Sequence, residues 1–220
     1  MSNTFALGLL SDLRVIDLGQ GISGPYAAKI LGGLGADVIK VEPPRGDDAR
    51  RIGPFPGDIQ DLEKSGLFLA LNVGKRSVVL DLESTCDASR FKALIESTDI
   101  IIENYELGVM EGLGLGFESL KRINPTLIMT SITPFGDWGP YRGYKGTDLI
   151  LSHMSGHAHT HGGQVNDPDV TPPVRASGHQ SELVSGMSAA TSTLMGVYRR
   201  RLTGFGGHIT VSSYESMVNQ

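Results

Sequence analysis

The sequence has a single cysteine, few aromatic residues and no long apolar run. Because Cys86 has no second cysteine to pair with, an internal disulfide is excluded and a reducing compartment is indicated. No apolar run approaches the roughly 18 residues that a membrane-spanning helix needs, and no charged-then-apolar leader opens the chain. These absences predict a cytoplasmic protein with no membrane partner.

Positive charge is also in short supply. The 19 Lys and Arg residues are outnumbered by 24 Asp and Glu residues, which gives a net charge of −5. The densest basic run, Arg199–Arg201, indicates no more than a solvated helix end. A general nucleic-acid binder is therefore disfavoured. The 40% hydrophobic and 20% charged residues are typical of a soluble globular protein.

Strand and helix patterns alternate through residues 1–135. Short apolar runs of strand length occur at 13–19, 36–42, 76–82, 98–105 and 126–135. Apolar residues recur at helical spacing in 25–35, 88–97 and 117–125. This alternation is typical of an α/β protein whose parallel sheet is covered by helices on both faces.

The pattern weakens between 136 and 178, where Gly, Pro and His accumulate, and we expect a long surface loop there. His157, His159 and His161 alternate in this segment, so on a strand they would share one face and provide metal ligands. A solvated loop flanked by glycine is the favoured interpretation. We therefore expect no metal site.

A helix is expected from about Ser181 to Arg201, in a stretch built largely from Gly, Ser, Ala and Thr. Glu182 stands at its start. The structural interpretation is an acid in the first turn that offsets the helix dipole. The functional interpretation is a carboxylate that takes part in chemistry. A short strand at 207–213 and the beginning of another helix follow, and the last residue, Gln220, carries no helix stop, so a truncated end is expected.

The segment "GQGISG", Gly19–Gly24, matches the G-x-G-x-x-G pattern of dinucleotide-binding turns. It follows a strand and opens a helix, and Glu42 ends the next strand, as that pattern requires. Pro25 and the Pro43–Pro44 pair weaken the match. An NAD-binding dehydrogenase domain is therefore kept as a weaker alternative.

Four longer segments decide between these interpretations. They read "RVIDLGQGISGPYAAKILGGLGADVIKVEPPRGDDAR", "LNVGKRSVVLDL", "DIIIENYELGVMEGLGLGFESLKRINPTLIMTSITPFGDWGPY" and "YRRRLTGFGGHITVS". In order and spacing they resemble the class III CoA-transferases, the family of formyl-CoA transferase, carnitine CoA-transferase and the bile-acid-inducible F-like proteins. The resemblance covers about 13–220.

The resemblance implies a Rossmann-like large domain, a smaller second domain and an interlocked homodimer or paired subunits. Family chains are far longer than this one. We therefore expect the large domain at 1–200 and the start of a linker toward a small domain at 201–220. The partners would be an acyl-CoA and a small carboxylic acid, so coenzyme A is a substrate and no cofactor is bound permanently.

The family's chemistry uses an aspartate that attacks an acyl-CoA and then carries CoA as a thioester. A carboxylate suits this role because it serves as both nucleophile and leaving group. The aspartate lies in an Asp-x-x-x-Gly-x-x-Ala-Ala pattern, which reads "ELVSGMSAA" here. The resemblance thus puts Glu182 at the nucleophile position, with one extra methylene, and Gly186 at the glycine. His179 is a neighbouring candidate whose spacing does not fit.

The resemblance also implies the residues that contact CoA. They are Ile22, Ser23, Leu80, Asp81, Leu82, Asn104, Tyr105, Lys145, Gly146, Thr147 and Asp148. Several positions that are often basic in the family are not basic here, namely Pro43, Glu83, Glu106 and Gly112. Lys75, Arg76 and Lys145 remain, and Arg45, Arg50 or Arg51 are candidates to compensate for the lost phosphate contacts.

The favoured function is a CoA-transferase that moves CoA between an acyl-CoA and a carboxylic acid. A non-catalytic subunit that supports a partner is the alternative, because Glu replaces Asp and cations are missing. An acyl-CoA racemase ranks lower, because Thr147 stands where that chemistry has a histidine. We also expect the small-residue helix to need a partner element, or to leave an apolar face open near Met187, Leu194 and Val197.

Overall fold

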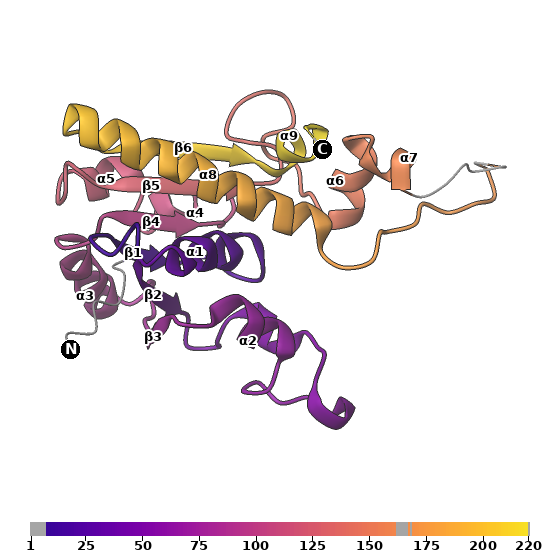
Figure 1. Ribbon diagram of the computed structural model, residues 1–220, viewed down its shortest axis with the longest axis horizontal. Coiled ribbons are helices and arrows are strands. Elements are labelled where there is room, and N and C mark those ends of the chain that lie inside the picture. The colour runs from indigo at the N-terminus through magenta and orange to yellow at the C-terminus, as the bar shows by residue number, and fades with distance from the viewer. Residues whose placement is uncertain (1–7, 162–166, 168, 220) are drawn as a thin grey trace, which may run out of the picture.

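The computed structural model describes residues 8–161, 167 and 169–219. Its centre is a parallel sheet in the order β3-β2-β1-β4-β5-β6 (Figure 1). The strands are β1 (Arg14–Asp17), β2 (Asp37–Glu42), β3 (Arg76–Val79), β4 (Ile100–Glu103), β5 (Ile128–Thr133) and β6 (Gly207–Ser212). The α/β prediction is confirmed, with helices and strands alternating along the chain.

Helices cover both faces of the sheet. Successive side chains along a strand point alternately toward the helices on one face and toward those on the other. The helices are α1 (Ser23–Gly33), α2 (Gly66–Asn72), α3 (Thr85–Ile95), α4 (Val109–Gly112), α5 (Phe117–Lys121), α6 (Asp148–Met154), α7 (His157–His161), α8 (Gln180–Thr203) and α9 (Ser213–Val218). Two short 3-10 helices, η1 (Asp48–Arg51) and η2 (Pro56–Asp58), follow β2. Ile100 and Ile102 pack with α1 and α8, whereas Ile101 packs with α3, α4 and α5. The sheet is therefore buried on both sides, as a parallel sheet requires.

The long helix α8 lies directly on α1 and on the sheet, because its contact residues are small (Figure 1). A Cβ atom added at Gly186 would lie 2.6 Å from the Ser23 carbonyl oxygen of α1. Ala189 and Ala190 are buried in the same contact. The helix ends at Gly204, whose φ of +78° favours glycine.

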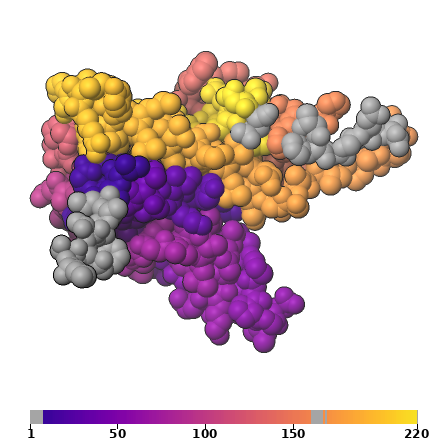
Figure 2. Space-filling model, viewed as in Figure 1, coloured from indigo at the N-terminus to yellow at the C-terminus, as the bar shows by residue number. Residues whose placement is uncertain are grey.

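The expectation that α8 needs an outside partner is corrected in part. Val197 is only 3% exposed, and Leu194 packs against the same core, so the chain itself covers this side of the helix. Met187, Met195 and Tyr198 are exposed on the helix. The outer side of α8 belongs to the surface in Figure 2.

Three further expectations are corrected by the structure. The sheet continues beyond residue 200, since β6 pairs with β5 from Ile128↔Gly207 to Thr133↔Ser212, so this segment is not a linker. The expected loop at 136–178 contains α6 and α7. His157 and His159 lie on α7 rather than in the expected solvated loop or on the strand that would align them, and the side chain of His161 lies outside the described residues.

In the part of the chain that the structure describes, no group of three His, Cys, Asp or Glu side chains is arranged to hold a metal ion. None of the helices in this part combines the length and apolar character needed to cross a membrane.

Candidate active site

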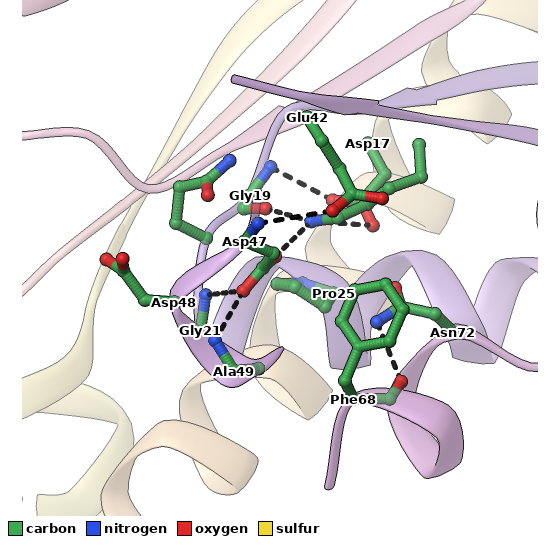
Figure 3. Close-up of polar contacts among 12 residues, drawn as sticks. Asp17, Gly19, Gly21, Pro25, Glu42, Asp47, Asp48, Ala49, Phe68 and Asn72 are labelled. Atoms are coloured by element: carbon green, nitrogen blue, oxygen red, sulfur yellow. Dashed lines mark hydrogen bonds and ion pairs between the residues drawn. The ribbon is translucent and has the colours of Figure 1, made fainter. Parts of the chain in front are cut away.

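The glycine turn between β1 and α1 is held by carboxylates. Asp17 Oδ1 accepts a hydrogen bond from Gly19 N at 2.9 Å. Asp47 Oδ1 accepts from Gly21 N at 2.9 Å and from Ala49 N at 2.7 Å (Figure 3). The turn is therefore fixed by side chains that follow two different strands of the sheet.

Two buried lysines neutralise these carboxylates. Lys40 Nζ lies 2.6 Å from Asp47 Oδ2 and 3.8 Å from Asp17 Oδ2, and it donates to the Gly19 carbonyl oxygen. Lys75 Nζ lies 2.8 Å from Asp17 Oδ2 and donates to the Pro25 carbonyl oxygen at 2.7 Å. Burial lowers the pKa of Lys75, and the charge of Asp17 opposes this shift. Buried charges survive only with such partners, so the cluster locks the turn in one geometry.

This network disfavours the dinucleotide interpretation. The Gly21 N–H group, which would face a pyrophosphate, is already bonded to Asp47. Glu42, which would bind a ribose, instead accepts from Arg50 Nε at 2.7 Å and from Ser77 Oγ at 2.8 Å. Burial alone would raise the pKa of Glu42, but these hydrogen bonds outweigh it and lower the pKa to about 2. Both features of the pattern are used within the protein.

Asn104, which follows β4, joins the turn to the next strand of the sheet. Its Oδ1 accepts from Gln20 N at 2.7 Å, and its Nδ2 donates to Ser23 Oγ at 3.0 Å. The neighbouring Tyr105 lines a cavity of about 180 Å³. The other lining residues are Gln20, Val41, Pro43, Arg45, Leu80, Asp81, Leu82, Glu83, Val109 and Leu113. Four predicted CoA positions, Leu80, Asp81, Leu82 and Tyr105, thus line one hollow. Two others, Ile22 and Ser23, are buried.

A second cavity of about 270 Å³ contains Lys145 and Gly146. It is also lined by Glu106, Leu107, Thr133, Pro134, Arg142, Gly143 and Tyr144. The Lys145 ammonium lies 3.8 Å from Glu106 Oε1, and both side chains are exposed. Tyr105 lines the first cavity and Glu106 lines this one, and both residues follow shortly after the end of β4. Both cavities therefore lie near the carboxyl ends of the strands, where open parallel sheets bind ligands.

Thr147 and Asp148 make internal contacts at the start of α6. Thr147 Oγ1 accepts from Ile150 N at 3.5 Å and caps the helix. Asp148 Oδ1 accepts from Ser181 N at 2.8 Å and from Ser181 Oγ at 2.6 Å. Asp148 thereby anchors the first turn of α8, which carries Glu182.

Glu182 is half-buried in this first turn, with Oε2 3.6 Å from His179 Nδ1. In the part of the chain described here, Oε2 is buried and has no hydrogen-bond partner. Burial raises the pKa of Glu182, the charge of Asp148 raises it further, and His179 and Arg175 oppose the shift. A carboxyl group with a raised pKa and a free oxygen is typical of a functional site.

The amino-acid sequence alone did not reveal the partners of these groups. His179, whose spacing did not fit the family pattern, lies beside the Glu182 carboxylate. Arg175 Nε lies 3.8 Å from Asp148 Oδ2. The Lys40–Asp47 pair joins a strand to a loop and follows no periodic pattern. The sequence sign that could have indicated this pair is the position of Lys40 within the apolar run of β2.

Comparison with known proteins decides the family. The sequence model described as CoA-transferase family III matches residues 10–220. The chain belongs to CoA-transferase family III. The outcome agrees with the resemblance found in the sequence.

Curated relatives extend this result. The chain is 36% identical over 217 residues to a succinyl-CoA:mesaconate CoA-transferase of Haloarcula hispanica, covering 97% of this chain and 54% of the relative. It is 39% identical over 213 residues to an acetyl-CoA:oxalate CoA-transferase of Acetobacter aceti, covering 96% and 52%. The chain thus spans about half the length of the curated relatives it matches. A crystal structure of a CAIB/BAIF family protein from Brucella suis superposes with a TM-score of 0.83 at 34% identity, covering 94% of this chain and 53% of that one.

Proposed function

We propose that this protein transfers CoA between an acyl-CoA and a carboxylic acid, with Glu182 as the nucleophile. One observation carries the proposal. Glu182 lies in the first turn of α8, where its buried Oε2 has no hydrogen-bond partner among the described residues and lies 3.6 Å from His179 Nδ1. The preceding residue, Ser181, is held by Asp148. The names of the relatives, which act between acyl-CoAs and carboxylates, support the same reaction class.

The reaction balances with a carboxylate alone. The Glu182 carboxylate attacks the thioester carbonyl, and the CoA thiolate leaves, which forms a mixed anhydride. The thiolate then attacks the glutamyl carbonyl, releases the first acid and forms a glutamyl-CoA thioester. The incoming carboxylate attacks this thioester to give a second anhydride, and the returning thiolate cleaves it to the new acyl-CoA. Each step exchanges a carboxylate and a thiolate, and Glu182 is regenerated.

The charge state of Glu182 sets a condition on this reaction. Only the ionised carboxylate is a nucleophile, yet burial and the Asp148 charge raise its pKa. His179 and Arg175 favour the ionised form. The site therefore balances a reactive, poorly solvated carboxylate against partners that keep it charged.

Among the three candidate arginines, Arg45 is the best placed for a CoA phosphate. The Arg50 side chain is only 14% exposed and is bonded to Glu42 and Glu63. Arg51 donates to the carbonyl oxygens of Asp47 and Arg45. Arg45 is 66% exposed and lines the cavity that contains Leu80 and Tyr105. We assign the phosphate-contacting role to Arg45.

A non-catalytic subunit is the alternative, and the relatives do not favour it, because they are named as CoA-transferases. Two relatives are named as subunits, the succinyl-CoA:(R)-benzylsuccinate CoA-transferase subunit BbsE of Thauera aromatica and the succinyl-CoA–L-malate CoA-transferase beta subunit of Chloroflexus aurantiacus. This chain also carries Glu at the position where the family pattern has Asp. Pairing with a second chain, identical or different, stays a prediction.

Trapping the intermediate tests the proposal. The protein is incubated with acetyl-CoA or succinyl-CoA, treated with hydroxylamine, and the modified peptide is mapped by mass spectrometry. We expect the label on Glu182 and its loss in Glu182→Ala, whereas Glu118→Ala, on the exposed part of α5, keeps it. Transfer activity that is unchanged in Glu182→Ala contradicts the enzyme proposal. Activity that appears only in Glu182→Asp indicates the non-catalytic subunit.

A further inference from the structure

One face of the sheet is polar at the carboxyl ends of β4, β5 and β6. Glu103 pairs in register with Ser131, and Ser131 pairs with Thr210. Side chains alternate along a strand, and five polar residues on this one face line the same cavity. They are Glu103, Ser131, Thr133, His208 and Thr210. Parallel strands covered on both faces are usually apolar, so a polar patch at this edge marks a ligand site rather than packing.

The patch is ordered by its own hydrogen bonds. Glu103 Oε2 accepts from Tyr105 N at 2.8 Å. His208 Nε2 lies 2.8 Å from Ser131 Oγ, and the His208 ring stacks on Phe117 with centroids 5.3 Å apart. These contacts hold the floor of the site in place before any ligand arrives.

Thr133 is the exception in this patch. Its side chain is buried, with the residue only 6% exposed, yet Oγ1 has no hydrogen-bond partner among the residues described. A buried hydroxyl without a partner loses its hydrogen bonds to water and gains none in return. Thr133 lines a cavity of about 200 Å³ above the patch, so a ligand in this cavity is positioned to supply the missing bond.

The charge of this cavity defines the ligand. Its rim carries three carboxylates, Glu106, Glu111 and Asp137, and its floor carries Glu103. Among the described residues that line it, there is neither Lys nor Arg. Such a cavity repels a second carboxylate and attracts a cation.

The adjoining cavity carries the opposite charge. It shares Glu106, Leu107 and Thr133 with the acid-lined cavity, and it also contains Arg142 and Lys145, whose ammonium lies 3.8 Å from Glu106 Oε1. It also contains Gly146, two residues before Asp148, whose carboxylate anchors the turn that bears Glu182. An acidic hollow thus lies beside one that contains two basic side chains.

We propose that the acid-lined cavity over Glu103 and Thr133 binds an ammonium group, so that one of the acids handled by this protein is a zwitterion. Its carboxylate lies toward Arg142 and Lys145, and its ammonium group donates to Thr133 Oγ1 and to the carboxylates. This inference rests on the proposed function, because it names the class of acid that exchanges CoA.

Glu103 supplies an independent signal of occupancy. Burial raises its pKa to about 7, with a smaller contribution from the charge of Glu111, while hydrogen bonds from Ser131 and the Tyr105 amide oppose the shift. The other titratable groups near this site are Glu106, Asp137, Glu118 and His208, and burial lowers the pKa of His208. A cation beside Glu103 lowers the pKa of its carboxyl group and releases a proton near pH 7.

Three matched series of acids test the proposal by calorimetry on the purified protein. The ammonium series is β-alanine, γ-aminobutyrate and δ-aminovalerate. A methyl replaces the ammonium group in butyrate, valerate and hexanoate, and a carboxylate replaces it in succinate, glutarate and adipate. We expect at least one ammonium acid to bind about tenfold or more tightly than both of its counterparts. Its binding enthalpy should vary with the ionisation enthalpy of the buffer, as proton release requires. Equal or tighter binding of the counterparts at every length overturns the proposal.

Two variants locate the effect. Thr133→Val removes the unpartnered hydroxyl and should reduce the preference for the ammonium acid, whereas Thr126→Val, on the exposed surface, should keep it. Because Thr133 is buried, Glu111→Gln on the exposed rim provides a second measurement, with Glu96→Gln on α3's exposed end as its control. A preference that is unchanged in both Thr133→Val and Glu111→Gln rejects this cavity as the site.

The two proposals fail separately. Ammonium acids that bind with the stated preference, together with no CoA transfer to any acid of the three series, overturn the proposed transferase and leave the ammonium site standing. A label on Glu182 together with transfer to dicarboxylates only supports the transferase and overturns the ammonium site.

Discussion

Asp148 and Ser181 are separated by 33 positions, yet Asp148 Oδ1 accepts hydrogen bonds from both the backbone nitrogen and the hydroxyl of Ser181. The start of α6 therefore fixes the start of α8. Since the next residue after Ser181 is Glu182, the same carboxylate both positions the proposed nucleophile and raises its pKa. Asp148 is a positioning residue whose effect is open to measurement.

Asp148→Asn should move the acid side of the pH profile. The amide keeps the shape of the side chain but removes a negative charge that raises the pKa of Glu182. The pKa of Glu182 should therefore fall, and kcat/KM for CoA transfer should reach its plateau at a lower pH than in the wild type. Asp169→Asn, an exposed substitution outside the site, should leave the profile in place. A profile in Asp148→Asn that does not shift, or shifts upward, contradicts the assignment.

Lys40→Met should destabilise the fold strongly. The substitution leaves Asp47 buried without its closest cation and removes a bond to the glycine turn. We expect a loss of about 3–5 kcal/mol in the free energy of unfolding, the usual cost of breaking one side of a buried pair. Urea unfolding followed by circular dichroism measures it. Lys64→Met, which removes an exposed ion pair with Asp61, serves as the control and should have little effect.

Protonation of the Glu42 carboxylate should lower the free energy of unfolding in acid. Its folded-state pKa of about 2 lies below its ordinary value of 4.5, so its contribution is complete above about pH 4.5. As the pH falls from 4.5 toward 2, about 3 kcal/mol of stability should be lost through this group. Glu42→Gln should flatten this part of the stability curve. Glu63→Gln removes the exposed carboxylate on the other side of Arg50, and a flattening of equal size there rejects the assignment.

Arg45→Gln should weaken CoA binding without affecting pantetheine. Pantetheine lacks the phosphates that Arg45 is proposed to contact, so only the dissociation constant for CoA should rise, by about tenfold. Isothermal titration with the two ligands measures the difference. Arg122→Gln, at the exposed end of α5, is the control. An equal loss for both ligands assigns Arg45 a structural role instead.

Local sequence patterns predicted most of the strands of the sheet. For the candidate nucleophile they predicted the position in the chain but not the side chains that surround it. Apolar runs such as Ile100–Ile102 are long enough to identify buried strands, and alternation with helices defines a parallel sheet. The run of small residues after Glu182 correctly indicated the beginning of a long helix, although its covering partner is α1 of the same chain. These signals are local in the sequence, so they need no knowledge of register.

The remaining features depend on residues that meet only after folding. The Lys40–Asp47 pair and the contact between His208 and Ser131 follow from strand order and register, neither of which is written in a local pattern. Helices α6 and α7 are short and lie in a Gly- and His-rich segment, where periodicity is too brief to detect. The features of the site that the sequence did not reveal are thus contacts between residues far apart in the sequence.

The absence of a side chain at Gly186 joins two parts of the site into one mechanical unit. The backbone of α8 lies against the Ser23 carbonyl oxygen, at a distance that any larger residue would have to increase. Ser23 belongs to the turn expected to hold CoA, and Gly186 lies one helical turn after Glu182. A displacement of the turn is therefore transmitted directly to the helix that bears the nucleophile. A substitution that moves the turn away from α8 would therefore also change the position of Glu182 relative to the turn. The shape of the expected CoA site and the position of the proposed nucleophile are thus coupled.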